Sequence, residues 1–296
     1  MEGKPQRKET KMATFYNQAT LTFDGRTLTS NRTEGEIVSR LTLTKTAVTT
    51  DYGPGDIIVY AITLVNNDNA DKTDITLTDD LGSFAPQGGP EVTPLTYEGG
   101  VILYYRNGVL QPTPTITTEN SLVITGINVP AGGNVIIIYE VEANEFAPRG
   151  ANAVINNTVI ATGAGICEEL TDTAQIPTRN EPQLSIAKAV CPEIVSCDDQ
   201  VTYTFIIQNT GNTPVVATDD LIVSDVYDPI LTNISVTLNG TALAEGTGYT
   251  YNEETGEFTT IGGAIPVPAA TFTRDPDTGV VNATPGVAVL TVTGTI

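Results

Sequence analysis

The chain has 296 residues, with 35 acidic and 14 basic side chains, no histidine and a formal net charge of -21. Such a surface repels nucleic acid and anionic lipid, so neither is expected as a partner. No run approaches the roughly 18 apolar residues of a membrane span, and the lack of histidine excludes serine–histidine–aspartate catalysis and the usual zinc sites.

Runs of alternating apolar and polar residues recur along the chain between turn signals: Asp24-Gly25, Pro54-Gly55, Asn107-Gly108 and Asn239-Gly240. Short alternating runs between turns are typical of all-β sandwiches. We therefore expect an all-β fold with two tandem sandwiches and an additional strand in front of them. The expected parts are a disordered tail (1–13), a donor strand (14–24), a connector (25–40), the first sandwich (41–180) and the second sandwich (181–296).

The first alternating run precedes both sandwiches and is predicted to be a strand that belongs to neither of them. It places five side chains on one face: Phe15, Asn17, Ala19, Leu21 and Phe23. The basic segment before it is not followed by an apolar stretch, so no signal peptide is predicted. The connector after it is polar and has few apolar anchors.

Two lysines stand at positions where an apolar residue is expected. Lys45 closes the alternating run 41–45, and Lys188 closes the run 184–188, so each lysine shares the apolar face of its strand. Burial of an unpaired ammonium group is costly. Each lysine must therefore be paired, neutralised or consumed in a reaction.

Two further polar residues of the first sandwich fall on apolar strand faces. Asp79 follows Ile75 and Leu77 at period two, and Asn157 lies between Ile155 and Val159. An amine, a carboxylate and an amide in one core favour an isopeptide bond between Lys45 and Asn157, with Asp79 as proton relay. The neighbours Asp80 and Asn156 are alternatives that period two disfavours. A buried ion pair with a hydrogen-bonded asparagine, and no covalent bond, is the other interpretation.

The chain repeats at an offset of 143 residues. The segment LTLTKTA…GDIIVYAITLVNN matches LSIAKAV…DDQVTYTFIIQNT, and ITLTDD matches LIVSDV, which pairs Asp79 with Asp225. These residues resemble the conserved-repeat domain of bacterial and archaeal surface proteins, a domain of unknown function. The resemblance implies immunoglobulin-like sandwiches in tandem arrays on cell surfaces. Its lysine, aspartate and asparagine positions are similar to those of domains that form internal isopeptide bonds.

The second repeat ends at 286–296, the counterpart of 132–143, without an asparagine-bearing final strand. We expect the N-terminal strand of another copy to complete this sandwich, with Lys188 bonded to Asn17 and Asp225 as the relay. Such a head-to-tail contact extends into a filament. Two alternatives are that residues 14–23 pair within their own chain, or that the chain is cut from a longer array.

The remaining candidates are cysteines and acidic turns. Cys191 and Cys197 flank a predicted turn and form either a local disulfide or two free thiols, with Cys167 left over. Acidic clusters at Asp79-Asp80, Asp198-Asp199, Asp219-Asp220 and Asp275/Asp277 form solvated turns or bind calcium (Ca2+) between loops. No dedicated metal site and no other cofactor is predicted.

Together these patterns predict a structural subunit, not an enzyme, whose partner is another copy of itself. The expected location is extracellular, on a cell surface or spore surface. An adhesin or cell-wall stalk module is the main alternative, and a carbohydrate-active module is the third.

Overall fold

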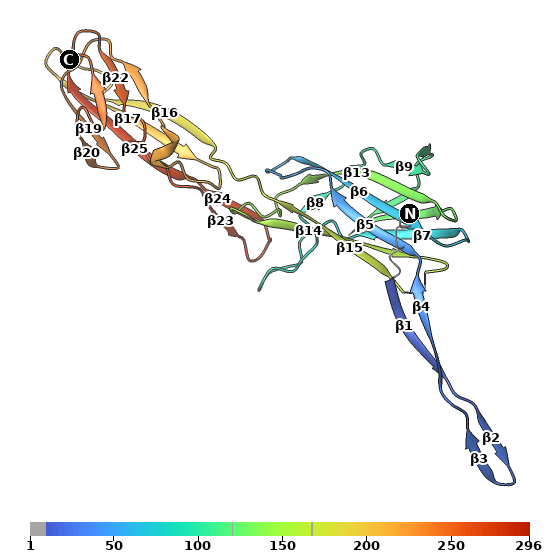
Figure 1. Cartoon of the computed structure of the whole chain (residues 1–296). Helices are drawn as coiled ribbons and strands as arrows, with labels where there is room; N and C mark the ends of the chain where they lie inside the picture. The colour runs from blue at the N-terminus through green and yellow to red at the C-terminus, as the bar shows by residue number, and fades with distance from the viewer. Residues whose placement is uncertain (1–9, 120, 167) are drawn as a thin grey trace, which may run out of the picture. The chain divides into compact units, whose positions relative to one another are not determined.

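The computed structural model describes residues 10–119, 121–166 and 168–296, and the chain is all-β, as predicted (Figure 1). It divides into two compact units at Pro177 and Thr178, with Gly88–Pro90 and Pro148–Ala153 grouped with the second unit. Residues 1–9 of the expected tail lie outside the described residues, whereas 10–13 belong to a strand.

Residues 10–39 form an antiparallel ribbon, which we call the N-terminal ribbon (Figure 1). Two hydrogen bonds of 2.9 Å between Ala19 and Ser30 join its two strand pairs, and its tip is Asp24-Gly25, where both residues have positive φ. The expected donor strand is therefore interrupted after Asn17, and the expected connector is the returning half of the ribbon. Residues 14–23 thus pair within their own chain, as one of the two alternatives predicted. The turn folds the chain back because Asp and Gly tolerate left-handed conformations. The strands are β1 (Thr10–Asn17) with β4 (Thr33–Ser39), and β2 (Thr20–Phe23) with β3 (Arg26–Thr29).

The rest of the first unit is a β-sandwich. Alternate residues of both sheets are buried between them and form one apolar core. One sheet has the order β10 (Val109–Gln111), β9 (Leu103–Arg106), β13 (Asn134–Ala143), β6 (Ile57–Asn66) and β5 (Leu41–Ala47), with β8 (Leu95–Thr96) also paired to β13. The other has the order β11 (Thr115–Thr118), β12 (Leu122–Val129), β7 (Lys72–Asp79), β14 (Val154–Thr162) and β15 (Leu170–Pro177).

The second unit has a full first sheet and a much smaller second sheet. The first has the order β16 (Leu184–Cys191), β17 (Gln200–Asn209), β25 (Gly286–Thr295), β19 (Thr232–Leu238) and β20 (Thr241–Leu243). The second has the order β18 (Ser224–Val226), β22 (Glu257–Thr260) and β21 (Tyr249–Tyr251). A 3-10 turn (Ala217–Asp219) and a hairpin of β23 (Thr271–Arg274) and β24 (Val281–Thr284) complete the unit.

The sequence repeat is also a structural repeat. Strands β5 and β16 begin 143 residues apart (184 − 41), as do β6 and β17 (200 − 57). The asparagine that ends β6 and the asparagine that ends β17 make equivalent hydrogen bonds. Asn66 donates hydrogen bonds to the carbonyls of Ala70 and Pro130, and Asn209 donates to those of Thr213 and Pro268. Each therefore fixes the loop that follows its strand.

The two units differ in one region. By sheet order, β18, β22 and β21 correspond to β7, β12 and β11, while β14 and β15 have no counterpart among the described strands of the second unit. The edge of β18 that would pair with such a strand is therefore open. Two strands are missing here, where the sequence pattern predicted one.

Candidate functional site

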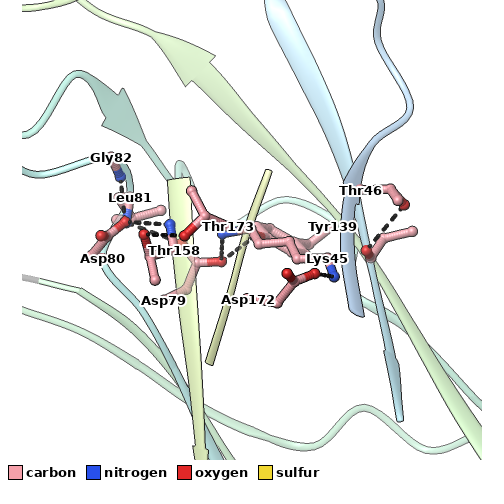
Figure 2. Close-up of polar contacts among 11 residues, drawn as sticks. Lys45, Thr46, Asp79, Asp80, Leu81, Gly82, Tyr139, Thr158, Asp172 and Thr173 are labelled. Carbon is pink, nitrogen blue, oxygen red and sulfur yellow. Dashed lines mark hydrogen bonds and ion pairs between the residues drawn. The ribbon is translucent and has the colours of Figure 1, made fainter. Parts of the chain in front are cut away.

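The first site is an ion pair buried between the two sheets of the first unit. Lys45 comes from β5, Asp79 comes from β7 of the facing sheet, and Nζ lies 2.6 Å from Oδ2 (Figure 2). Both side chains are almost wholly buried, with exposed fractions of 0% and 1%. Burial lowers the pKa of Lys45, although Asp79 opposes this effect. Loss of the proton to give the neutral amine, the nucleophilic form, is therefore easier than in an exposed lysine.

Tyrosine and backbone groups hold the Asp79 carboxylate in place. The Tyr139 hydroxyl donates a hydrogen bond to the same Oδ2 that Lys45 contacts, and the Leu81 amide donates to Oδ1 at 3.0 Å. Burial raises the pKa of Tyr139, so its hydroxyl stays a neutral donor. The Tyr60 ring stacks on Tyr139 and lies 5.0 Å from Lys45 Nζ. Both tyrosines were missed by the sequence analysis, although both occupy inward positions of their strands.

Asn157 reaches this cluster from β14. Its neighbour at period two, Val159, pairs directly with Asp79, so Asn157 and Asp79 share the inward face. Asn157 is fully buried, and neither its Oδ1 nor its Nδ2 has a hydrogen-bond partner within the described parts of the chain. A buried amide without partners costs about 1–3 kcal/mol. Burial raises the pKa of both Tyr60 and Tyr139, and the nearby Asn157 amide partly opposes the rise.

The two alternative residues have other roles. Asn156 is exposed, and its Oδ1 accepts a hydrogen bond of 2.8 Å from Gln175. Asp80 Oδ1 accepts hydrogen bonds from the amides of Gly82 and Thr158, each 2.8 Å long (Figure 2). The structure therefore brings together Lys45, Asp79 and Asn157, the set that strand alternation predicts. An amine, a hydrogen-bonded carboxylate and an unpartnered amide are the groups that amide exchange requires.

The second site repeats this arrangement in the second unit, but it is open. Lys188 on β16 forms an ion pair with Asp225 on β18, and the Lys188 side chain is 40% exposed where that of Lys45 is 0% exposed. Its expected burial is not found, because the strands that would cover it are absent from the described part of this unit. The ring of Tyr203 lies 4.7 Å from Lys188 Nζ, and the equivalent ring of Tyr60 lies 5.0 Å from Lys45 Nζ.

A different tyrosine takes the place of Tyr139 in the second site. Val292 lies opposite Tyr203, where Tyr139 lies opposite Tyr60, so β25 supplies no hydroxyl. Instead Tyr227, two residues after Asp225, packs its ring 4.9 Å from that of Tyr203. The Tyr227 hydroxyl is buried and has no partner among the residues described, and burial raises its pKa. This donor is unused in the isolated chain.

Apolar residues continue the open site along β16. Leu184 is 42% exposed and Ile186 is 58% exposed, whereas Leu41, the equivalent of Leu184, is 3% exposed. Leu184, Ile186 and Lys188 share one strand face. We call this face, with the open edge of β18, the acceptor groove.

The predicted donor residues lie in the N-terminal ribbon and face solvent. Large apolar side chains are more than half exposed at Phe15, Leu21, Phe23 and Leu28. Asn17 is exposed and pairs with Thr33, and Ala19 links the two strand pairs. Asn17 belongs to the first unit and Lys188 to the second, and the bond between Lys188 of one copy and Asn17 of another stays a prediction.

The cysteine and metal predictions have different outcomes. Cys191 and Cys197 are free and exposed, so the predicted disulfide is absent from the structure. Cys191 lies in β16 opposite Thr202, whereas Cys197 lies beyond the strand in the turn. Cys167 lies outside the described residues. No group of three metal-ligating side chains occurs in residues 10–119, 121–166 and 168–296. The Asp275 carboxylate instead accepts hydrogen bonds from its own turn.

The difference in exposure between the lysines has a direct chemical test. Acetic anhydride should acetylate Lys188 of the folded monomer much faster than Lys45, as measured by peptide mass spectrometry. The lowered pKa of Lys45 favours the reactive amine, but the reagent cannot reach it. Equal labelling rates would contradict the closed first site.

No protein-family model and no curated protein matches the chain. Among solved structures it is similar to the major pilin subunit of Bacillus cereus, with 10% identity and a TM-score of 0.35 over 92% of this chain and 73% of that one. A C-terminal fragment of the major pilin of Streptococcus agalactiae has 12% identity and a TM-score of 0.35, covering 84% and 91%. A family 123 glycoside hydrolase from Clostridium perfringens has 9% identity and a TM-score of 0.32, covering 48% of this chain and 28% of that one.

No helix in the described part of the chain is long and apolar enough to cross a membrane.

Proposed function

We propose that the protein is a structural subunit of an extracellular filament or surface appendage, in which the N-terminal segment of one copy fills the acceptor groove of the next. The observation that carries this proposal is the open second sandwich. Leu184 and Ile186 are exposed there, although the equivalent face of the first unit is covered by β14 and β15. Exposed apolar faces and unpaired strand edges favour strand addition.

The first unit would be locked by a covalent bond. Neutral Lys45 Nζ attacks the Asn157 side-chain carbonyl carbon, a new C–N bond forms, and the carbon–NH2 bond breaks. Asp79 accepts the proton released by the attacking amine and delivers it to the departing nitrogen, so ammonia leaves and Asp79 is unchanged overall. The fold supplies most of the rate by holding the groups together. Tyr139 keeps the carboxylate oriented through its hydrogen bond.

The same exchange would seal one subunit to the next. Lys188 and Asp225 already form an ion pair, and the incoming strand would bring the Asn17 amide to the position that Asn157 holds in the first unit. The unused Tyr227 hydroxyl is available to orient the groups there. Each filament contact would then be covalent.

A module of an adhesin or cell-wall stalk is the second candidate. It is favoured by the same tandem sandwiches, since the groove would be filled by neighbouring segments of a longer array. Negative-stain electron microscopy of the purified chain separates the two, because fibres are expected for the filament subunit and single particles for the stalk module.

Denaturing mass spectrometry tests the covalent chemistry. The monomer should be lighter than its sequence by about 17 Da, the mass of one ammonia. Assembled material should lose one further ammonia for each contact and should run as a ladder in SDS. The Lys45→Met chain is the control. Its monomer should have the full mass of its sequence, and its assembled form should still be lighter by one ammonia for each contact. A monomer of unchanged mass would contradict the bond between Lys45 and Asn157.

A further inference from the structure

We propose that the donated element is the whole N-terminal ribbon, so that the ends of β1 and β4, the link at Ala19 and Ser30, and the start of β2 enter the acceptor groove together as a preformed hairpin. This inference rests on the proposed function and deepens it, because it names the partner segment. Strand donation by β1 alone would leave the groove half filled, since the second unit lacks counterparts of both β14 and β15.

The lengths and connection of the two strand pairs agree. Strands β14 and β15 have 9 and 8 residues and pair antiparallel. Strands β1 and β4 have 8 and 7 residues and also pair antiparallel. In each pair the asparagine lies on the first strand. With Asn17 placed on Asn157, the strand direction is kept, β1 covers β14 up to Asn157, and residues 19–22 fall on Val159–Thr162, the part of β14 that pairs with β7.

The inward faces correspond residue by residue when Asn17 is placed on Asn157. Phe15 then falls on Ile155, which is buried in the first unit. On the returning strand, Thr33 pairs with Asn17 as Ala174 pairs with Asn157. The face of the ribbon that would turn inward is thus the one that carries the apolar residue and the amide.

The returning strand also offers a polar contact that the first unit uses. In the first unit Asp172 lies two residues before Ala174, and its carboxylate accepts a hydrogen bond of 2.6 Å from the Lys45 backbone amide (Figure 2). Asn31 lies two residues before Thr33 and has a side-chain oxygen that accepts hydrogen bonds. It would meet the backbone amide of Lys188, and β1 alone supplies no such group.

The opposite face of the ribbon suits solvent. Arg32 stacks its guanidinium over the Tyr16 ring at 3.6 Å, and Glu34 and Glu36 lie exposed on the same strand. The equivalent outer face of the first unit is also polar, with hydrogen-bonded pairs of Asn156 with Gln175 and Thr158 with Thr173.

Insertion of the intact ribbon also preserves its own hydrogen bonds. Seven residue pairs join β1 to β4, from Thr10 with Ser39 to Asn17 with Thr33. Donation of β1 alone would first break this ladder and leave its backbone groups to find new partners. Hairpin donation keeps this ladder and adds a new one to β18, made by residues 19–22 in the place of Val159–Thr162.

A disulfide staple across the ribbon separates the two modes. Thr14 and Glu36 lie directly opposite each other, at the ~4.5–5.5 Å Cα spacing of antiparallel pairs, which a disulfide spans. The test chain carries Thr14→Cys and Glu36→Cys, with Cys167, Cys191 and Cys197 replaced by serine. Filament yield is measured by electron microscopy and sedimentation, with and without dithiothreitol. The matched control carries Thr14→Ser and Glu36→Ser.

Equal filament yield in both conditions is the expected result, because the stapled ribbon enters as a unit. Filaments that form only in reductant would overturn hairpin donation and leave single-strand donation in place. If neither the stapled chain nor the serine control assembles in any condition, while the wild-type chain does, the test is repeated with Tyr16→Cys and Glu34→Cys. A wild-type chain that stays monomeric throughout would overturn the proposed function and this inference with it.

Discussion

Replacement of Asn157 by alanine should lower the stability of the first unit by about 4–5 kcal/mol, because it would remove the proposed cross-link, which closes a loop of roughly 100 residues. For a domain of this size the unfolding temperature should fall by about 10–20 °C. The change leaves the Lys45 and Asp79 side chains in place, so the variant can form the ion pair of the unbonded site. Differential scanning calorimetry measures the shift, and mass spectrometry should show that the loss of ammonia has disappeared.

The sign of this effect separates the covalent site from an ion pair without a bond. If no bond forms, Asn157 is a buried amide without hydrogen bonds within the described chain, and its removal costs little or even stabilises. Asn66→Ala is the matched control, since Asn66 is a buried asparagine that donates to three carbonyl oxygens. It should destabilise the unit while the mass decrement remains. The bond would be contradicted if the Asn157→Ala chain had the stability of the wild-type chain and the same difference between measured mass and sequence mass.

Strand alternation was sufficient to place the first site. Lys45, Asp79 and Asn157 were assigned to inward faces by period two alone, and their burial agrees with that assignment. The reason is physical: once one face of a strand is apolar, the side on which every residue lies is fixed. The matching bounds of β5 with β16 and of β6 with β17 likewise follow from the sequence repeat.

Other features depend on the arrangement of distant segments, which alternation does not encode. The sheet order shows two missing strands. The sequence suggested only one, because β15 carries no distinctive residue pattern. The polar segment 25–40 gave no apolar signal for β3 and β4 and was predicted to be a connector, although Asp24-Gly25 was identified as a turn. The hydroxyl of Tyr139 comes from β13 and that of Tyr227 from the residue after β18, so their equivalence appears only in space.

The exposure of Lys188 differs from what the sequence pattern predicts. Its position on β16 predicts burial, and the prediction would hold in a completed sandwich. An ion pair with Asp225 that is partly exposed and a Tyr227 hydroxyl without a partner are expected of a core that is open on one side. In an assembled filament Lys188 should therefore become as resistant to acylation as Lys45.

Deletion of residues 1–40 should abolish assembly, because it would remove the proposed donor and leave the acceptor groove intact. The core of the first unit begins at Leu41, and the ribbon strands belong to neither of its sheets, so the sandwich should keep its fold. Ile186→Glu should abolish assembly in the opposite way, by placing a charge in the groove while the donor remains. Loss of the isoleucine burial alone costs about 1.5–3 kcal/mol, or roughly 10–100-fold in affinity.

Ile206→Glu is the matched control for the groove variant. Ile206 is 39% exposed on the neighbouring strand, but the residue paired with Ile186 is Ile207, so Ile206 faces away from the groove. This chain should assemble as the wild type does. Circular dichroism verifies that all three proteins are folded.

The two defective chains should complement each other, and only to a dimer. The chain without residues 1–40 has a groove and no donor, and the Ile186→Glu chain has a donor and no groove. Mixed in equal amounts, they form one contact and then have nothing left to propagate, because each contact is heterologous. Analytical ultracentrifugation should show a one-to-one complex where each protein alone is monomeric. A mixture that stays monomeric, or a deleted chain that still forms fibres, would show that the second sandwich is closed by something other than a neighbour's N-terminal segment.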